Sequence, residues 1–137
     1  MYGLKCDMMN KYWLATLRAI ELLHYGKTTS PVDAWEKATI EIFGRGTPSQ
    51  EKGCPKITFL ALCGTGRVKG IKAGTYTKSE KNKSYALKAL ELIEKDSYLA
   101  RDPNLLWEKI MGGEHKAHNG QMHVVLSLWH NDLIVNE

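Results

Sequence analysis

The sequence predicts an all-α fold, a single compact domain of five to six helices over residues 1–137. Apolar residues recur at three- and four-residue steps, the spacing that places them on one face of a helix. Residues typical of helix starts and helix stops separate these segments at short intervals. No stretch approaches the ~18 consecutive apolar residues of a membrane span, so we expect no membrane segment.

The first two predicted helices lie in the N-terminal third. Residues 8–25 carry an apolar stripe that ends near Gly26. This stripe consists of Trp13, Leu17, Ile20 and Leu23. Ser30 and Pro31 supply an N-cap and a first-turn proline, and they start a second helix that Gly44 ends. Its apolar stripe consists of Trp35, Ala38, Thr39 and Ile42.

The middle of the chain combines a short helix with a glycine-rich segment. A loop over 46–52 leads to a third, short helix with Pro55 in its first turn, which Gly64 and Gly66 end. Residues 67–77 contain glycines that disfavour a helix, so we expect a loop or a brief strand pair there. This basic loop would separate two helices, an arrangement that loosely resembles a helix-turn-helix.

Three further helices are predicted after this loop. A capping-box pattern at 77–80 starts a fourth helix that runs to about Glu94. Asp102-Pro103 starts a fifth, which the glycines at 112–113 end. Asn119 caps a sixth. The apolar face of the sixth consists of Met122, Val125, Leu126 and Trp129. The four tryptophans are assigned to the core: Trp13, Trp35, Trp107 and Trp129.

Positive charge is concentrated in the middle of the chain. Between Arg45 and Lys88 there are ten basic residues and only two acidic ones, whereas the net charge of the whole chain is +4. Such segregation attracts phosphates, nucleic acids or acidic protein faces. We therefore predict a non-enzymatic binding module for an anionic partner, with nucleic acid as the leading candidate. A solvated lysine-rich surface is the alternative interpretation.

The predicted interface combines the glycine loop with the helix that follows it. Cationic side chains would hold phosphates, Asn82 would read a base edge, and a tyrosine would stack on a base. The predicted binding residues are Lys52, Arg67, Lys69, Lys72, Tyr76, Lys81, Asn82, Lys83 and Tyr85. Backbone N–H groups of the loop could also converge on an anion. GTGRVKG lacks the Gly-Lys-Ser/Thr ending of a phosphate-binding loop, however, which favours a plain connector.

A second hypothesis is a small enzyme or ligand-binding pocket. Cys54 lies between two lysines at a predicted helix N-terminus, where the helix dipole favours the thiolate. A histidine of residues 115–123, with His118 as the first candidate, would be its partner base. His115, His118 and His123 also offer three nitrogens to zinc, but their spacing is not that of an HExxH helix. We therefore expect no metal or other cofactor.

A third hypothesis keeps the basic face and gives it an acidic protein as partner, so that the chain would be an adaptor or inhibitor. The three cysteines are an odd number without paired spacing and indicate a reducing compartment. The N-terminus lacks the small-residue cleavage site of a signal peptide. We therefore expect a cytoplasmic protein. The sequence leaves the oligomeric state open.

Short motifs follow one another in a distinctive order from about residue 30 to residue 134. They are KGCP at 52–55, FL and LC within 59–63, VKGI at 68–71, NK and YA within 82–86, LW at 106–107, and HN and QM within 118–122. This succession resembles a family of small bacterial proteins classed as a domain of unknown function. The resemblance implies a single bacterial or phage-borne domain of this length. It implies no activity, so function must be argued from the residues.

Overall fold

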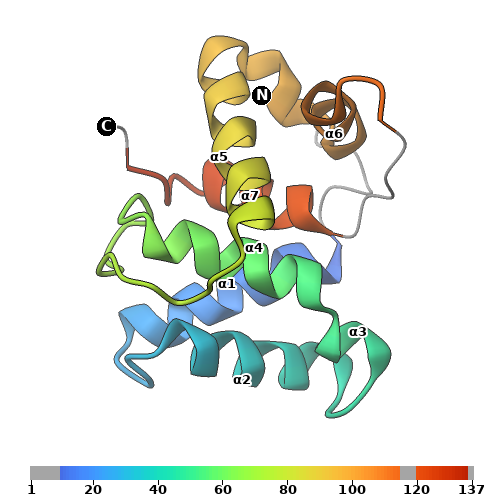
Figure 1. Ribbon diagram of the computed structural model, residues 1–137. Helices are drawn as coiled ribbons and strands as arrows, with labels where there is room; N and C mark the ends of the chain where they lie inside the picture. Colours follow the sequence, from blue (N-terminus) through green and yellow to red (C-terminus); the bar gives the residue numbers. More distant parts are fainter. Residues whose placement is uncertain (1–9, 115–119, 136–137) are drawn as a thin grey trace.

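Six α-helices of nine or more residues make up most of the computed structural model, which describes residues 10–114 and 120–135 (Figure 1). They are α1 (Lys11–His24), α2 (Pro31–Phe43), α4 (Gly53–Gly64), α5 (Glu80–Lys95), α6 (Pro103–Met111) and α7 (Gln121–His130). Two short helices complete the set, the one-turn α3 (Pro48–Glu51) and the 3-10 helix η1 (Ser97–Arg101). The predicted all-α fold is confirmed. Among the described residues, every helix is too short or too polar to cross a bilayer.

Several helix starts lie where the sequence places them. The hydroxyl of Ser30 accepts the N–H of Asp33 at 3.2 Å, and Pro31 is the first residue of α2. The carboxylate of Asp102 likewise accepts the N–H of Asn104 at 3.0 Å, at the start of α6. α1 begins at Lys11, later than the expected residue 8. These side-chain caps satisfy N–H groups that have no partner inside the helix.

The expected loop over 46–52 was wrong in part, because it contains α3. Thr47 caps α3 by accepting the N–H of Gln50 at 3.3 Å, and Pro48 is its first residue. The helix that follows, α4, starts at Gly53, so Pro55 lies in its first turn as predicted. A four-residue helix is too short to show an apolar periodicity, which is why the pattern missed it.

The capping box expected at 77–80 is displaced. α5 starts at Glu80 with Ser79 as its N-cap, and the hydroxyl of Thr77 accepts the N–H of Ser79 at 3.3 Å. The N-cap of α7 is Gly120, whose φ of 88° lies in the left-handed region. Asn119, the predicted cap of this helix, lies outside the described residues.

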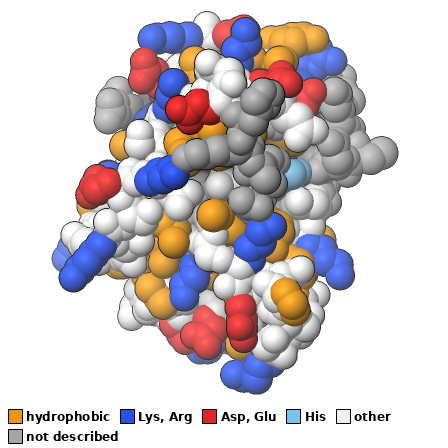
Figure 2. All heavy atoms as spheres, turned by 45° about the vertical axis from the view of Figure 1, so that its right-hand side comes forward, with side chains coloured by type: hydrophobic (Ala, Val, Ile, Leu, Met, Phe, Trp, Pro, Cys, Tyr) orange, Lys and Arg blue, Asp and Glu red, His pale blue; other side chains and the backbone are white. Residues whose placement is uncertain are grey.

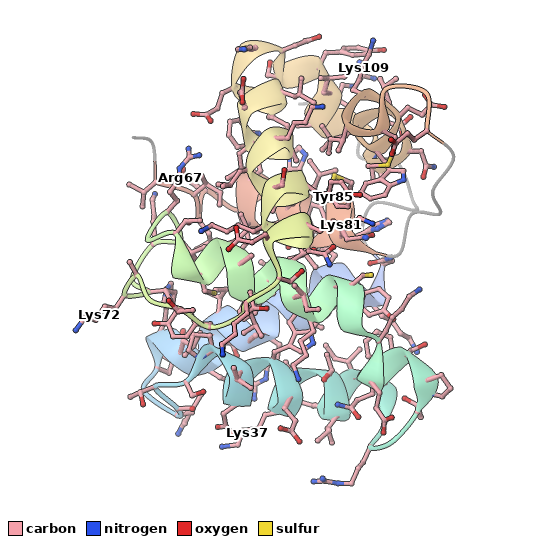
Figure 3. All side chains as sticks on the ribbon, in the orientation of Figure 1. Lys37, Arg67, Lys72, Lys81, Tyr85 and Lys109 are labelled. Carbon is pink, nitrogen blue, oxygen red and sulfur yellow. The ribbon has the colours of Figure 1, made fainter. Side chains whose placement is uncertain are left out.

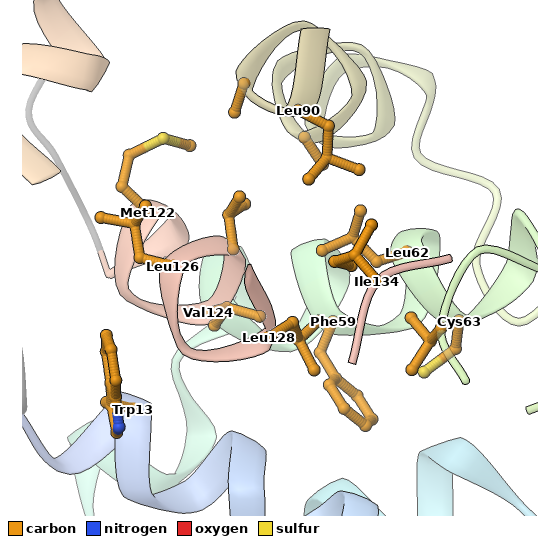
Figure 4. Packing of buried hydrophobic residues seen from close by; sticks show 14 of the residues in the cluster. Trp13, Phe59, Leu62, Cys63, Leu90, Met122, Val124, Leu126, Leu128 and Ile134 are labelled. Atoms are coloured by element: carbon orange, nitrogen blue, oxygen red, sulfur yellow. The ribbon is translucent and has the colours of Figure 1, made fainter. Parts of the chain in front are cut away.

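Helix α7 is the centre of the core. It contacts α1, α4, α5, α6 and η1, and all residues from Gln121 to Leu128 are buried. Figure 4 shows Val124 and Leu128 of α7 beside Phe59 of α4. Trp129, the last residue of the predicted apolar face, packs against the core but is only partly buried. A helix enclosed on all sides has no exposed face to reveal a stripe.

The other three tryptophans lie in the core, as predicted. Trp13 is 2% exposed, Trp35 1% and Trp107 6%. Trp35 stacks on Phe59 with 5.1 Å between the ring centroids, so that α2 packs on α4. Each large apolar side chain buried in this way stabilises the fold by roughly 1.5–3 kcal/mol.

The segment between α4 and α5 is a loop bound to the C-terminal tail. Val68 and Ile134 form an isolated antiparallel bridge, and both side chains are buried. The N–H of Lys69 donates to the carbonyl of Leu133 at 2.8 Å, and the N–H of Val135 donates to that of Arg67 at 2.6 Å. The brief strand pairing expected here is therefore made with residues far along the chain. It connects the start of the glycine loop to the residues that follow α7.

Candidate nucleic-acid interface

The glycine loop folds back on the end of α4. The N–H of Gly74 donates to the carbonyl of Gly64 at 3.2 Å, and a Cβ at Gly64 would lie 2.6 Å from the carbonyl oxygen of Gly74. The hydroxyl of Tyr76 donates to the carbonyl of Lys72 at 2.6 Å, and the Tyr76 ring covers Gly74. These glycines therefore allow one backbone to lie directly against another.

Five backbone N–H groups of this loop have acceptors within the protein. Those that donate to described protein atoms belong to Gly66, Arg67, Lys69, Ile71 and Gly74. An anion-binding loop needs successive N–H groups that point outward together. These five groups are therefore not available to an anion.

Two cations of the predicted interface form ion pairs within the protein. The guanidinium of Arg67 donates to the carboxylate of Glu94 at 3.3 Å and to the carbonyl of Val135 at 3.1 Å, and its side chain is only 12% exposed. The Lys69 ammonium pairs with Asp132 at 3.1 Å. Both cations therefore bind the C-terminal part of the chain to the loop. They contribute little free positive charge to the surface.

Lys88, a third cation of the basic stretch, is also engaged. Its ammonium donates to the carbonyl of Ile110 at 3.2 Å, in the last turn of α6. The face drawn in Figure 2 mixes basic and acidic side chains instead of showing one continuous basic area. Part of the charge concentrated in the sequence is thus engaged within the fold, by Arg67, Lys69 and Lys88.

In the glycine loop and at the start of α5, four exposed lysines make no ion pair with a described residue: Lys72, Lys78, Lys81 and Lys83. In Figure 3, Lys72 projects from the far end of the loop, well away from Lys81 at the start of α5. Lys81 and Lys83 are two residues apart on a helix, so they extend from its two sides, about 200° apart. We call Lys78, Lys81 and Lys83 the α5 lysine group.

Asn82 is less exposed than Lys81 and Lys83 on either side of it. It lies on the same side of α5 as Ala86 and Ala89, both buried, and its side-chain oxygen is buried without a hydrogen-bond partner among the described residues. The predicted reading of a base edge by Asn82 therefore conflicts with its position. Ser84, which the sequence analysis did not single out, is exposed on the outer side of the helix. Helical periodicity applied within α5 could have indicated this difference.

The two predicted stacking tyrosines differ in their surroundings. Tyr85 packs edge-on against Trp107, with 5.3 Å between ring centroids, and is part of the packing between α5 and α6. Tyr76 is half-buried and lines a small cavity of about 120 Å³ together with Leu60 and Lys83. Tyr76 therefore lies beside Lys83, whereas Tyr85 is one helical turn from Lys81 on α5 (Figure 3).

The remaining candidates lie at the other end of α4. Lys52 is its exposed N-cap and Cys54 lies half-buried in its first turn. Twelve residues of helix, about 18 Å, separate them from the glycine loop, so Cys54 and the loop share no pocket. Burial raises the pKa of the other described thiol, Cys63, to about 12.

The histidine candidates are only partly covered by the structure. His115 and His118 lie outside the described residues, whereas His123 is buried on α7. In the part of the chain that the structure describes, no three side chains of the metal-binding types gather at one point. The sequence analysis missed a cavity between α2, α3 and α4, because α3 itself was not predicted.

Comparison with known proteins places the chain in a family. Residues 9–135 match the family described as a family of unknown function, DUF6979. The chain belongs to this family. The resemblance expected from the short motifs is thereby confirmed, and the match extends over nearly all of the chain. No curated protein and no solved structure matches it. Because the family has no assigned activity, function must be argued from the geometry above.

Proposed function

We propose that the protein is a non-enzymatic module that binds nucleic acid through the start of α5. One observation carries this proposal: Lys78, Lys81 and Lys83 are exposed and make no ion pair with described residues, whereas Arg67 and Lys69 are paired. Free lysines near a polyanion release its condensed counterions, which supplies most of the affinity of such modules. Binding by this group needs no catalytic residue.

The start of α5 suits contacts with two phosphate backbones. Lys81 and Lys83 extend from opposite sides of the helix, as do phosphate-contacting side chains of a helix lying in a groove. Ser79, the N-cap, makes no side-chain hydrogen bond to the first turn of α5. The positive end of the helix dipole therefore adds to the attraction of the lysines. Ser84 lies next to Lys83 on the outer side of α5 and is the candidate for contact with a base edge.

The proposal also covers the cellular compartment and the origin of the protein. The odd number of cysteines supports a reducing, cytoplasmic compartment, and the family resemblance supports a bacterial or phage origin. The nucleophile hypothesis has weaker support, because Cys54 and the glycine loop lie at opposite ends of α4.

Binding to a labelled 20-base-pair DNA duplex and to single-stranded DNA and RNA of the same length tests the proposal. Fluorescence anisotropy at about 50 mM salt would compare the wild type with the triple variant Lys78→Gln, Lys81→Gln, Lys83→Gln. We expect the variant to lose about tenfold or more in affinity, because three phosphate contacts disappear. Glutamine preserves the helix propensity of the two helical positions, 81 and 83.

The matched control removes the same charge elsewhere. Lys27, Lys37 and Lys109 are exposed on other elements, and Lys37 forms an exposed ion pair with Asp33 at 3.0 Å. Their triple glutamine variant removes the same formal charge and should bind within about threefold of the wild type. Equal losses of affinity in both variants would mean that binding depends only on the net charge of the protein. Absence of wild-type binding to every probe would refute the proposal.

An acidic protein partner is the second candidate function. The outer side of α5 carries an open groove of about 500 Å³, in which Leu87 and Leu92 lie beside Lys83 and Lys88. Apolar side chains next to lysines fit a protein surface better than a phosphate backbone. Leu87→Ser would leave nucleic-acid binding unchanged and weaken a protein complex, which separates the two functions.

A further inference from the structure

A cavity of about 350 Å³ lies between α2, α3 and the first turn of α4. Its volume is at the lower end of the range seen for small-molecule sites. The walls include the apolar side chains of Trp35 and Ile40 and four charged side chains, Glu36, Arg45, Glu51 and Lys56. This cavity is formed by other residues than the α5 lysine group.

Hydrogen bonds hold the α3 side of the cavity in place. The side-chain oxygen of Gln50 accepts the N–H of Gly46 at 3.2 Å, and its side-chain nitrogen donates to the hydroxyl of Thr39 at 3.2 Å. The hydroxyl of Tyr12 donates to the carbonyl of Ser49 at 3.0 Å, which connects α3 to α1. The short helix is therefore anchored at two points, and the cavity between it and α2 is preformed.

Trp35 contributes a buried donor without an acceptor. The residue is 1% exposed, and its indole N–H is buried with no hydrogen-bond partner among the described residues. The stacking on Phe59 fixes the plane of the ring. Buried polar groups are almost always paired, so this orphan donor is unusual. A water molecule does not reach the N–H, so Trp35 contributes to the wall of the cavity through its ring.

The charged side chains around the cavity are of both signs and do not neutralise one another. Glu36, Arg45, Glu51 and Lys56 make no ion pair within 4.0 Å with any described residue. Elsewhere the structure does pair such groups, as in Arg67 with Glu94. Opposite charges that share a cavity without pairing match a ligand that carries both charges.

We propose that this cavity binds a small zwitterion with one carboxylate and one ammonium group, of the size of a free amino acid or a dipeptide. The carboxylate accepts from Arg45 and Lys56. The ammonium group donates to Glu36 or Glu51, and the apolar part of the ligand lies against Ile40. Charge-assisted hydrogen bonds of this kind are about twice as strong as neutral ones, which favours zwitterions over uncharged molecules.

Titration of the full chain with free L-amino acids and glycine dipeptides tests the proposal. The measured signal is the indole ¹H–¹⁵N resonances of the four tryptophans. We expect at least one probe to bind below about 1 mM and to shift the Trp35 indole resonance. Trp35→Phe would identify that resonance by its disappearance. If this core variant does not fold, assignment by backbone connectivity gives the same information.

Arg45→Gln is the decisive variant, because Arg45 is exposed and its replacement leaves the core intact. We expect about a tenfold loss of probe affinity, against no change for Lys27→Gln outside the cavity. Propionate and propylamine, each with one of the two charges, should bind at least about tenfold more weakly than the zwitterion. Absence of any shift at about 10 mM probe, equal binding of either single-charge compound, or wild-type affinity in Arg45→Gln would overturn the proposal.

Discussion

The same kinds of residue have different surroundings at the two ends of helix α4. At the C-terminal end, Gly64 lies against Gly74, Cys63 is fully buried, and the nearby Arg67 is paired with Glu94. At the N-terminal end, Gly53 has open space around it and Arg45 lines a cavity without an ion pair to a described residue. Glycine, cysteine and arginine thus have structural roles at one end and remain accessible at the other.

This difference shows that charge density along a sequence overstates the charge available to a partner. The ten basic residues of the middle segment include three that the fold engages, Arg67, Lys69 and Lys88. Those at the start of α5 and around the cavity remain free of ion pairs with described residues. Function is therefore expected from the second set, and stability from the first.

The glycines provide the largest expected contrast between the two ends. Gly64→Ala places a Cβ 2.6 Å from the carbonyl oxygen of Gly74, and overpacking against backbone costs about 1–3 kcal/mol of unfolding free energy. Gly53→Ala meets no atom within 4 Å and should change stability by less than about 1 kcal/mol. Urea denaturation of both variants measures the difference. Similar values for the two would contradict the described packing of the loop on α4.

The arginines provide the next contrast. Arg67→Gln removes the hydrogen bonds to Glu94 and to the carbonyl of Val135, which should lower the unfolding free energy by about 1–2 kcal/mol. Arg45→Gln should change it by less than about 0.5 kcal/mol. Chemical denaturation measures both values. An Arg67 variant as stable as the Arg45 variant would show that the tail is held without this cation.

The buried thiol gives a smaller, pH-dependent effect. Burial raises the pKa of Cys63 from 9.0 to about 12, so the unfolded chain ionises this thiol before the folded protein does. The stability that depends on the protonated thiol is complete below pH 9 and is lost as the pH rises further. We expect a loss of about 1 kcal/mol by pH 10. Cys63→Ala should show less alkaline destabilisation than the wild type, and identical pH profiles would contradict the burial.

Much of the fold could be predicted from local signals. Ser30, Pro31, Asp102 and Pro103 start helices where expected, because capping depends on a few adjacent residues. The position of α7 could not be predicted in this way, since burial from Gln121 to Leu128 depends on which helices surround it. The bridge between Val68 and Ile134 joins residues distant in sequence, and no local pattern marks it.

The candidate site was less predictable than the fold. The concentration of lysines is visible in the sequence, but the pairing of Arg67 with Glu94 depends on the crossing of the loop and α5. Asn82 lies on the buried side of α5 because of its position in the helical repeat. The sequence did not predict this, because the predicted start of the helix was misplaced. The cavity beside Trp35 needs α3, an element too short for a periodic pattern.

The salt dependence of nucleic-acid binding tests the role of the α5 lysine group most directly. If Lys78, Lys81 and Lys83 each neutralise one phosphate, the slope of log affinity against log salt concentration includes a contribution of about −2 to −3 from them. Replacing all three with glutamine should make the slope shallower by that amount, while the Lys27, Lys37 and Lys109 control keeps the wild-type slope. An unchanged slope in the α5 variant would contradict the account.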